Sequence, residues 1–537
     1  MSHMDSTAED VRDGKRARLA PSADADLISA LGDDVLVRFL GLAADARDAV
    51  RTGALSRRWR GLWTRVPALR FASPPATEAD SAAALHRYVS AVDRALSLRA
   101  QSGHAVESLA ISFTAPCSLP GLVEERLVPA WTRAAQGWIR YAVQQGVKSF
   151  AVELHAPPEA AVIRQVDFNV YKRPAVAFDE LPSPARLETM RLALGGARLR
   201  LPATVVFASL TDLSLERIKV AVGSGHLLAR LVSPASCPNL RKLRLRMVRF
   251  LDSIGELLLE ADALLELWLE NVSYLRCLEL RAPSLRVFHM EKCEHEALII
   301  SAPRLEELEF FQEWCPLQLV VNEGLTCVRT LKLQLWSHGA PIHKTDNDIC
   351  TLLLKHCSTV KCLHVTLEGR QIFEEDVDMI NGRIQQLPHV ASLSIHVSPW
   401  FGQHNFGAGV ATLLTPFTNI RHLSLHLPRF INLWHDLHLG LNLLCDHPNH
   451  WTSHEIYFVY LEEIELTGLT GIDCELWFVE TVLSSATRLQ KVAISFNHDC
   501  LQVQGKMDAF ERMLIGVGMW TFHRDAPTHT CLKPSPA

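Results

Sequence analysis

The hydrophobic and polar positions near the N-terminus follow the spacing of three short helices. The first helix has apolar residues at helical intervals and begins with Asp33 and Asp34, which suit the positive end of a helix dipole. Asp45 is expected to cap a second helix and Ser56 a third, which carries two tryptophans. Three short helices cannot bury that much apolar surface by themselves. We therefore expect this unit to pack against the rest of the chain or against another protein.

Farther along the chain, one pattern recurs, apolar-x-x-apolar-x-apolar, which we call the repeat phrase. It occurs fourteen times, from Val106-Leu109-Ile111 to Leu489-Val492-Ile494, and successive copies start 20 to 41 residues apart. Such recurrence indicates leucine-rich repeats, whereas an ordinary all-β domain would not explain it. Each phrase predicts a short strand with its apolar residues in a shared core, and the segments between are expected to form turns or helices on the outer side. A helix is also expected over Ala82 to Leu98, where the apolar residues share one face.

Composition and charge narrow the class of protein. A net charge of -5 over 537 residues gives no basic balance, so we expect no nucleic acid partner. The 13 cysteines include no Cys-x-x-Cys pair, which favours a reducing compartment, and no apolar run reaches the length of a membrane span. We expect a protein of the nucleus, the cytoplasm or both. Residues 1–26 are expected to be a disordered tail, and the basic cluster within residues 14–18 is either a nuclear import signal or simply solvated.

The N-terminal pattern resembles the F-box of plant F-box proteins. The matching residues run in the order Ile28-Ser29-x-Leu31-x-Asp33-Asp34-Val35-Leu36, Asp48-Ala49-Val50-Arg51-Thr52 and Leu55-Ser56-Arg57-Arg58-Trp59-Arg60-x-Leu62-Trp63. The resemblance implies docking to the adaptor subunit of an SCF ubiquitin ligase and, through it, to a cullin. The residues that would form or support that surface are Leu31, Val35, Leu36, Leu40, Leu55, Trp59, Leu62 and Trp63.

Gly32 departs from the family pattern, which usually has proline at this position. Proline fixes the backbone at the start of a helix, whereas glycine leaves it looser. We expect this difference to weaken docking by roughly 1 kcal/mol rather than to abolish it.

The C-terminal part resembles the FBD module of many plant F-box proteins. The matching stretches are Tyr460-Leu461-Glu462-Glu463-Ile464-Glu465-Leu466-Thr467-Gly468-Leu469, Glu475-Leu476-x-Phe478-Val479-x-x-Val482-Leu483 and Ala486-x-x-Leu489-x-Lys491-Val492-x-Ile494. They predict a strand, a helix and a strand that close the end of the solenoid. The chain beyond His523 is expected to be unstructured, and the proline-rich stretch from Ala156 to Pro184 is expected to be an insertion on one rim.

Residues that flank the inward-facing leucines are expected to lie on the concave face of the solenoid, where a partner could bind. The candidates for substrate binding are Trp268, Glu309, Phe311, His364, His396 and His426. The alternative is that they only form a solvated face. No phosphate loop, nucleophile elbow or His-Glu-x-x-His motif occurs, so the sequence gives no positive case for an enzyme and none for a cofactor.

One cluster invites comparison with a metal site, because it holds five histidines and a cysteine within twenty residues. Its members are His435, His438, Cys445, His447, His450 and His454. Zinc frameworks usually present pairs of cysteines, and the chain has 24 histidines, so we interpret this stretch as a polar loop and expect no metal.

The sequence thus predicts an α/β chain with a three-helix F-box followed by an irregular leucine-rich-repeat solenoid. Its expected divisions are residues 1–26 (tail), 27–71 (F-box), 72–104 (linker and helix), 105–455 (solenoid), 456–500 (FBD-like repeats) and 501–537 (C-terminal tail). The expected function is that of a non-catalytic subunit that recognises a protein substrate for an SCF-type ubiquitin ligase. Two alternatives stay open: a receptor of the same architecture that depends on a small molecule, and a binding scaffold that acts outside any ligase.

Overall fold

The structure is a computed structural model of the whole chain. It describes residues 28, 31–43, 45–73, 81–115, 127–155, 175–177, 185–201, 204, 206–220, 225–251, 255–312, 318–339, 343–369, 377–378, 380, 384, 387–398, 406–427, 456–469, 473–496, 512, 520–526 and 529–534. The expected N-terminal tail, most of the expected rim insertion and the histidine-rich cluster lie outside the described residues.

The N-terminal unit contains the expected helices, but the third differs from the prediction. The elements are α1 (Asp33–Gly41), α2 (Ala46–Arg51) and two 3₁₀ segments, η1 (Thr52–Ala54) and η2 (Trp59–Arg65). Asp45 caps α2 as expected, by accepting a hydrogen bond from the backbone of Arg47. The prediction of Ser56 as the cap of a third α-helix was wrong, because η2 begins after Arg58 and has no side-chain cap. So short a segment gains little from α-helical propagation, which explains the tighter 3₁₀ winding.

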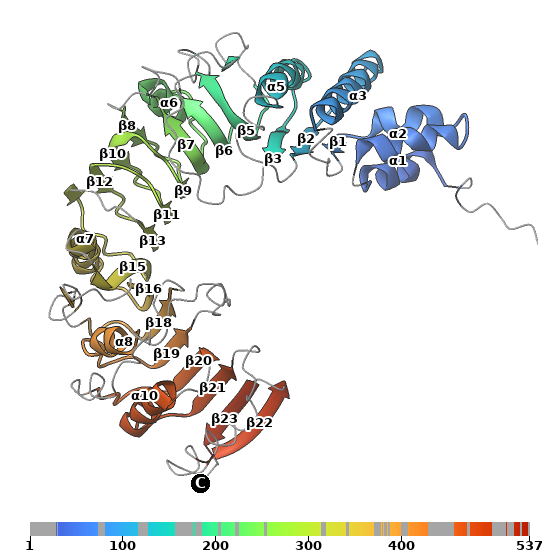
Figure 1. Cartoon of the computed structure of the whole chain (residues 1–537). Coiled ribbons are helices and arrows are strands. Elements are labelled where there is room, and N and C mark those ends of the chain that lie inside the picture. Colours follow the sequence, from blue (N-terminus) through green and yellow to red (C-terminus); the bar gives the residue numbers. More distant parts are fainter. Residues whose placement is uncertain are drawn as a thin grey trace, which may run out of the picture.

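The strands of the solenoid form one curved, parallel sheet in the order of the chain. Figure 1 shows them along the inner side of an open arch, with the N-terminal helices at one end. All fourteen repeat phrases fall at strands of this sheet. These strands are β2 (Ser108–Thr114), β3 (Ser149–His155), β5 (Thr189–Arg200), β6 (Asp212–Val220), β7 (Lys242–Phe250), β9 (Glu266–Glu270), β11 (Val287–Glu291), β13 (Glu307–Phe311), β15 (Thr330–Gly339), β16 (Cys362–Gly369), β18 (Ser392–Val397), β19 (His422–His426), β20 (Glu463–Leu469) and β21 (Lys491–Phe496).

A further copy of the repeat phrase precedes the fourteen. Val66, Leu69 and Phe71 have the same spacing and are buried, and β1 (Ala68–Ala72) pairs in parallel with β2. The sequence interpretation had assigned these residues to the end of the F-box. The solenoid sheet therefore starts three residues after the last N-terminal helical segment.

The outer side of the arch carries helices at both ends but strands in the middle. The helices are α3 (Ser81–Gln101), α5 (Val128–Gln144), α6 (Gly225–Val232), α7 (His343–His356), α8 (Phe406–Leu414) and α10 (Asp473–Ser485). The helix expected over residues 82–98 is therefore confirmed as α3. In the centre a second parallel sheet replaces helices, with the strands β8 (Gly255–Glu260), β10 (Leu275–Arg281), β12 (Ala297–Ser301) and β14 (Gln318–Val321). Turns or helices were expected there, but the repeats are shortest in this region and their alternating apolar residues favour strands.

The core lies between the two sides of the arch and is continuous along it. The apolar residues of the repeat phrases stack in register, as Leu267, Phe288, Leu308 and Leu331 do on four successive inner strands. All four are fully buried. Because each repeat buries its face only against its neighbours, the solenoid must fold as a stack. Among the described residues, no helix is long and apolar enough to cross a membrane.

A residue with a left-handed backbone conformation lies within β6 and β7 and directly follows β9 and β11. Arg217, Met247, Asn271 and Lys292 have φ between 49° and 51°, and each follows a residue in the same register row of the sheet. Gly468 repeats this conformation within β20 with φ 81°, and a Cβ there would lie 2.3 Å from the carbonyl oxygen of Leu427. Glycine is therefore required at position 468, whereas the other positions carry the strain of a side chain.

The C-terminal end contains more structure than the sequence predicted. The expected order of strand, helix and strand is present as β20, α10 and β21. The chain then forms an antiparallel hairpin of β22 (Trp520–Ala526) and β23 (His529–Pro534), and β23 pairs with β21. The expectation of an unstructured tail beyond His523 was therefore wrong. The sequence interpretation assigned no repeat phrase to these strands, and they form because the edge of β21 offers unpaired backbone groups.

Candidate functional site

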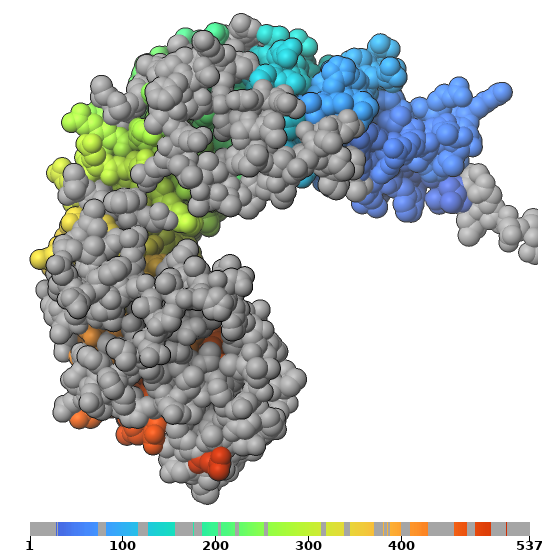
Figure 2. Space-filling model, viewed as in Figure 1, coloured from blue at the N-terminus to red at the C-terminus, as the bar shows by residue number. Residues whose placement is uncertain are grey.

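The N-terminal unit leaves large apolar side chains exposed at one end of the arch. They are Ile28, Val35, Phe39, Leu42 and Leu55, with exposed fractions from 40% for Val35 to 81% for Leu42, and we call them the exposed apolar set. Val35, Phe39 and Leu42 follow each other at i, i+4 and i+7 and share one face of α1. Figure 2 shows the unit at one end of the arch. Exposed apolar side chains of this size are typical of a protein interface.

The structure separates the predicted adaptor-binding residues into three groups. Val35 and Leu55 are exposed, so a partner can contact them directly. Leu31 and Trp59 are partly buried and pack against the core. The remaining residues are buried and can only support the surface; they are Leu36, Leu40, Leu62 and Trp63.

The sequence interpretation missed three members of the exposed apolar set as binding residues: Ile28, Phe39 and Leu42. Phe39 is one of the apolar residues that recur at helical intervals in the first helix, but it is not among the predicted binding residues. Its position four residues after Val35 was the available signal, because residues at that spacing lie on the same helix face.

Ion pairs hold the start of α1 against η2. Arg58 lies 2.8 Å from a carboxylate oxygen of Asp33, and Arg65 lies 2.7 Å from Asp34. Gly32, the residue before α1, has φ -67°, which matches the fixed angle of proline, and a Cβ there would meet no atom within 4 Å. The backbone at this position therefore accepts the proline that the family pattern usually has.

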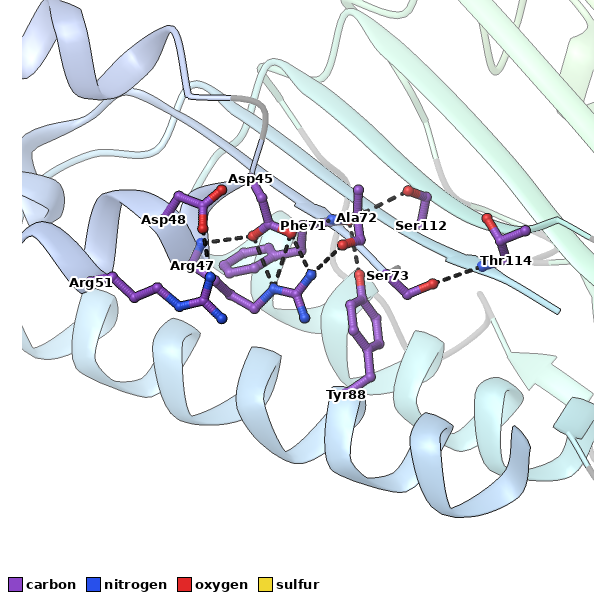
Figure 3. A network of polar contacts seen from close by, with 10 residues as sticks. All are labelled: Asp45, Arg47, Asp48, Arg51, Phe71, Ala72, Ser73, Tyr88, Ser112 and Thr114. Carbon is purple, nitrogen blue, oxygen red and sulfur yellow. Dashed lines mark hydrogen bonds and ion pairs between the residues drawn. The ribbon is translucent and has the colours of Figure 1, made fainter. Parts of the chain in front are cut away.

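A network of polar contacts, which we call the joint, connects the N-terminal unit to the solenoid. Figure 3 shows Asp45 and Arg47 of the α2 start directed at the end of β1. Arg47 forms an ion pair of 2.5 Å with Asp45 and donates to the carbonyl oxygen of Ala72, while the amide of Ala72 donates to Asp45 at 3.2 Å. The guanidinium of Arg47 also lies 5.4 Å from the ring centre of Tyr88 on α3. The hydroxyl of Tyr88 donates to the carbonyl oxygen of Phe71 at 2.8 Å.

Burial and hydrogen bonds in the joint shift the pKa values of its ionisable groups. Burial disfavours the charge of Asp45, but hydrogen bonds from Arg47 outweigh this effect and lower the pKa of the carboxyl. A second arginine, Arg99 on α3, is 1% exposed and donates to the carbonyl oxygens of Val66 and Ala105 at 2.8 and 2.9 Å. Burial lowers the pKa of Arg99. Two arginines thus connect the end of the helical unit with β1 and α3.

The predicted substrate-binding residues lie on the concave face in two adjacent register rows. A register row is the set of residues that pair with one another across successive parallel strands. Trp268, Glu309 and His364 fall in one row, together with His289, which the sequence interpretation missed. The second row contains Phe311, followed after two strands by Thr366, His396 and His426 on β16, β18 and β19. The sequence had placed these side chains on one face because they alternate with the buried residues of each strand.

The centre of the first row is a stack of charged and aromatic groups. The guanidinium of Arg244 lies 5.2 Å from the ring centre of Trp268, and the ring of His289 stacks on Trp268 with centroids 4.6 Å apart. Nδ1 of His289 is 3.2 Å from the carboxylate of Glu309, which is 3.0 Å from Nζ of Lys332. Burial opposes the charge on His289, but the carboxylates of Glu291 and Glu309 outweigh it and raise its pKa to about 9. His289 is therefore a cation at neutral pH.

The histidines in the C-terminal part of the concave face are neutral, in contrast to the cationic His289. The rings of His396 and His426 stack with centroids 4.3 Å apart, and Nδ1 of His426 lies 2.8 Å from the hydroxyl of Thr467. Burial and the neighbouring histidines lower the pKa of His396, and burial lowers the pKa values of His426 and His364. This region thus presents neutral imidazoles at neutral pH, next to a strongly charged centre.

The structure gives no support to a metal centre in the part of the chain that it describes. No group of three or more histidine, cysteine or acidic side chains there is arranged to hold an ion. The expected absence of metal at residues 435–454 is untested, because those residues are not described.

Comparison with known proteins supports the fold and the resemblance. Residues 187–337 match a family model described as the LRR repeats of the FBD-associated F-box protein At5g56370. A protein of Arabidopsis thaliana named F-box/FBD/LRR-repeat protein At5g52460 is 46% identical over 52 residues, which cover 10% of this chain and 14% of the relative. Another Arabidopsis protein, named FBD-associated F-box protein At5g56400, is 46% identical over 48 residues, or 9% of this chain and 10% of the relative.

These matches confirm the predicted resemblance to plant F-box proteins with leucine-rich repeats and an FBD module. Together with the long run of parallel strands, the family match over residues 187–337 confirms an α/β leucine-rich-repeat solenoid. The matched stretches span only a small part of each relative, 14% and 10% of their lengths.

Proposed function

We propose that this protein recognises a protein substrate for an SCF-type ubiquitin ligase and supplies no catalytic group of its own. The N-terminal unit would dock to the adaptor subunit, and through it to a cullin, while the concave face would hold the substrate. The F-box, FBD and LRR names of the similar proteins support a recognition role of this general kind. The exposed apolar set carries the proposal, because it is an unpartnered apolar surface on the part of the chain that resembles an F-box.

The mechanism would be proximity. A substrate bound on the concave face would be held near a ubiquitin-loaded enzyme that is attached to the same complex, so its effective concentration there would be high. The joint supports this mechanism, because it links the docking helices directly to the first strand of the solenoid. A fixed link limits the volume that the substrate explores.

Binding of the full chain to the SCF adaptor subunit tests the proposal. We expect the wild type to bind and a Val35→Ser/Leu55→Ser variant to bind at least about tenfold more weakly, since both side chains are exposed members of the apolar set. Leu98→Ser is the matched control, because Leu98 is an exposed leucine on α3 and its loss should leave binding unchanged.

Gly32→Pro provides an independent check. The backbone angle of Gly32 already suits proline, so we expect the variant to bind the adaptor about two- to fivefold more tightly than the wild type. Absence of adaptor binding by both the wild type and Gly32→Pro would refute the ligase role and favour a scaffold outside any ligase. Equal binding by the wild type and the double variant would show that the exposed apolar set is not the docking surface.

A further inference from the structure

Charged side chains on the concave face are largely neutralised by partners on neighbouring strands. The pairs include Lys242 with Glu266 at 2.9 Å, Arg246 with Glu270 at 2.9 Å, and Lys332 with Glu309 at 3.0 Å. His289 lies between two carboxylates. Each of these cations already has a carboxylate beside it, so the pair presents little net charge to a charged partner.

Arg244 is different from its neighbours in the same row. Its side chain is exposed, and it makes no ion pair with any residue that the structure describes. The nearest acids on β6 lie opposite other cations, because Asp212 is in register with Lys242 and Glu216 with Arg246. Stacking on Trp268 holds the guanidinium in place, and a stacked guanidinium keeps its in-plane N–H donors available.

The register row of Arg244 continues toward β2 with mostly small side chains. Its register partner on β6 is Ser214, a small side chain with a hydroxyl, and the next residue along the row is Arg191 on β5. Arg191 is 3.9 Å from Glu153, a long ion pair. Beyond Arg191 the same row continues with Ala151 and Ala110 on β3 and β2. Small side chains on this part of the sheet let an extended segment of another protein approach the strands closely.

We propose that Arg244, together with Ser214 and Trp268, forms a binding site for a carboxylate. This carboxylate belongs to an acidic segment of the protein that binds the concave face. The guanidinium supplies the positive charge and paired N–H donors, and the hydroxyl of Ser214 supplies a further donor. The acidic segment extends toward β2 past Arg191 and over the alanine positions, whereas the paired charges of the centre present little net charge to it. This inference names a class of substrate, and it therefore rests on the proposed function.

Selection of peptides on the full-length protein tests the inference. A displayed library of random twelve-residue peptides is selected on the wild type, on Arg244→Glu and on Arg133→Glu, a control that reverses the charge of an exposed arginine on α5. We expect peptides selected by the wild type and by Arg133→Glu to be enriched in Asp and Glu. Arg244→Glu should lose these peptides and enrich Lys and Arg instead.

The selected peptides are then synthesised, and their affinity is measured by fluorescence anisotropy. We expect Arg244→Glu to weaken binding at least about tenfold, and Arg244→Lys to weaken it less because the charge remains. Peptides without an excess of acidic residues, equal binding by Arg244→Glu, or binding only after serine phosphorylation would each overturn the proposal. Adaptor binding by the same preparations keeps the two hypotheses apart: peptide binding without adaptor binding refutes the ligase role alone.

Discussion

At the scale of single residues, the concave face shows how neighbouring strands decide the charge of a side chain. His289 and His396 are both histidines on inner strands, yet their pKa values move in opposite directions. His289 lies between the carboxylates of Glu291 and Glu309, so it is held as a cation. His396 stacks on another histidine and stays neutral. The residue type is the same, and the partners across the sheet make the difference.

The raised pKa of His289 predicts how the stability of the protein depends on pH. A histidine whose pKa rises from about 6.5 in the unfolded chain to about 9 on folding stabilises the folded state fully below pH 6.5. This contribution is lost as the pH rises toward 9. We therefore expect the free energy of unfolding to differ between the wild type and His289→Gln most at pH 6, and progressively less up to pH 9.

Chemical denaturation at a series of pH values measures this difference. His389→Gln, which replaces an exposed histidine, is the matched control for the loss of an imidazole. A difference between the wild type and His289→Gln that is constant from pH 6 to pH 9 would mean that His289 is not held as a cation.

At the scale of elements, the joint connects a helix start, a strand end and a second helix. Asp45 both caps α2 and accepts the amide of Ala72 at the end of β1, so the same carboxylate orders two elements. Arg47 contacts this carboxylate, the carbonyl oxygen of Ala72 and the ring of Tyr88. The orientation of the helical unit therefore depends on a few partly buried polar groups in addition to the apolar core that the unit shares with the first strand.

Loss of Arg47 should loosen the helical unit without unfolding the solenoid. We expect Arg47→Ala to lower the free energy of local opening in α1 and α2 by about 1–3 kcal/mol, because it leaves Asp45 without its charged partner. Hydrogen–deuterium exchange should show faster exchange in these helices and unchanged exchange in the central strands, such as β9 and β11.

Arg51→Ala is the matched control for the joint. Arg51 also pairs with an aspartate of α2, but both side chains of that pair are exposed, and Figure 3 draws the pair at the opposite end of the network from Ser73 and Thr114. Exposed pairs contribute little to stability, so this variant should exchange like the wild type. Equal exchange in Arg47→Ala and Arg51→Ala would show that the joint does not order the unit.

At the scale of the whole molecule, different elements cover the two ends of the sheet. At the N-terminal end β1 is covered by the joint and α3, whereas at the C-terminal end the hairpin of β22 and β23 adds antiparallel strands to β21. A repeat stack with an open edge exposes unpaired backbone groups and tends to associate. The hairpin therefore acts as the closing cap of the described sheet.

Disruption of this cap should lower the stability of the solenoid. Thr530 pairs with Ile494 of β21 and with Arg524 of β22, so proline at this position removes a backbone donor from the ladder. We expect Thr530→Pro to lower the melting temperature by several degrees and to increase association, as seen by calorimetry and light scattering. Thr530→Val keeps the donor and should behave like the wild type; if both variants melt alike, the hairpin is not a cap.

Much of this protein follows from its sequence alone, because repeat proteins encode structure locally. The repeat phrase fixes which residues of each strand are buried, and all fourteen predicted copies fall at inner strands. The same alternation places Trp268, Glu309 and His364 on the concave face. The helix over residues 82–98 and the C-terminal order of strand, helix and strand also follow from local periodicity.

Only the tertiary structure decides features that depend on neighbouring elements. The separation of Val35 and Leu55, which are exposed, from Leu36 and Trp63, which are buried, requires knowing what each helix packs against. The central outer strands and the C-terminal hairpin form because other strands lie beside them. Charge also depends on register, since His289 is a cation because of carboxylates on its own and the next strand, and Arg244 stacks on Trp268 without an ion pair to any described residue. Periodicity is a property of one segment, whereas exposure, pairing and pKa belong to contacts between segments.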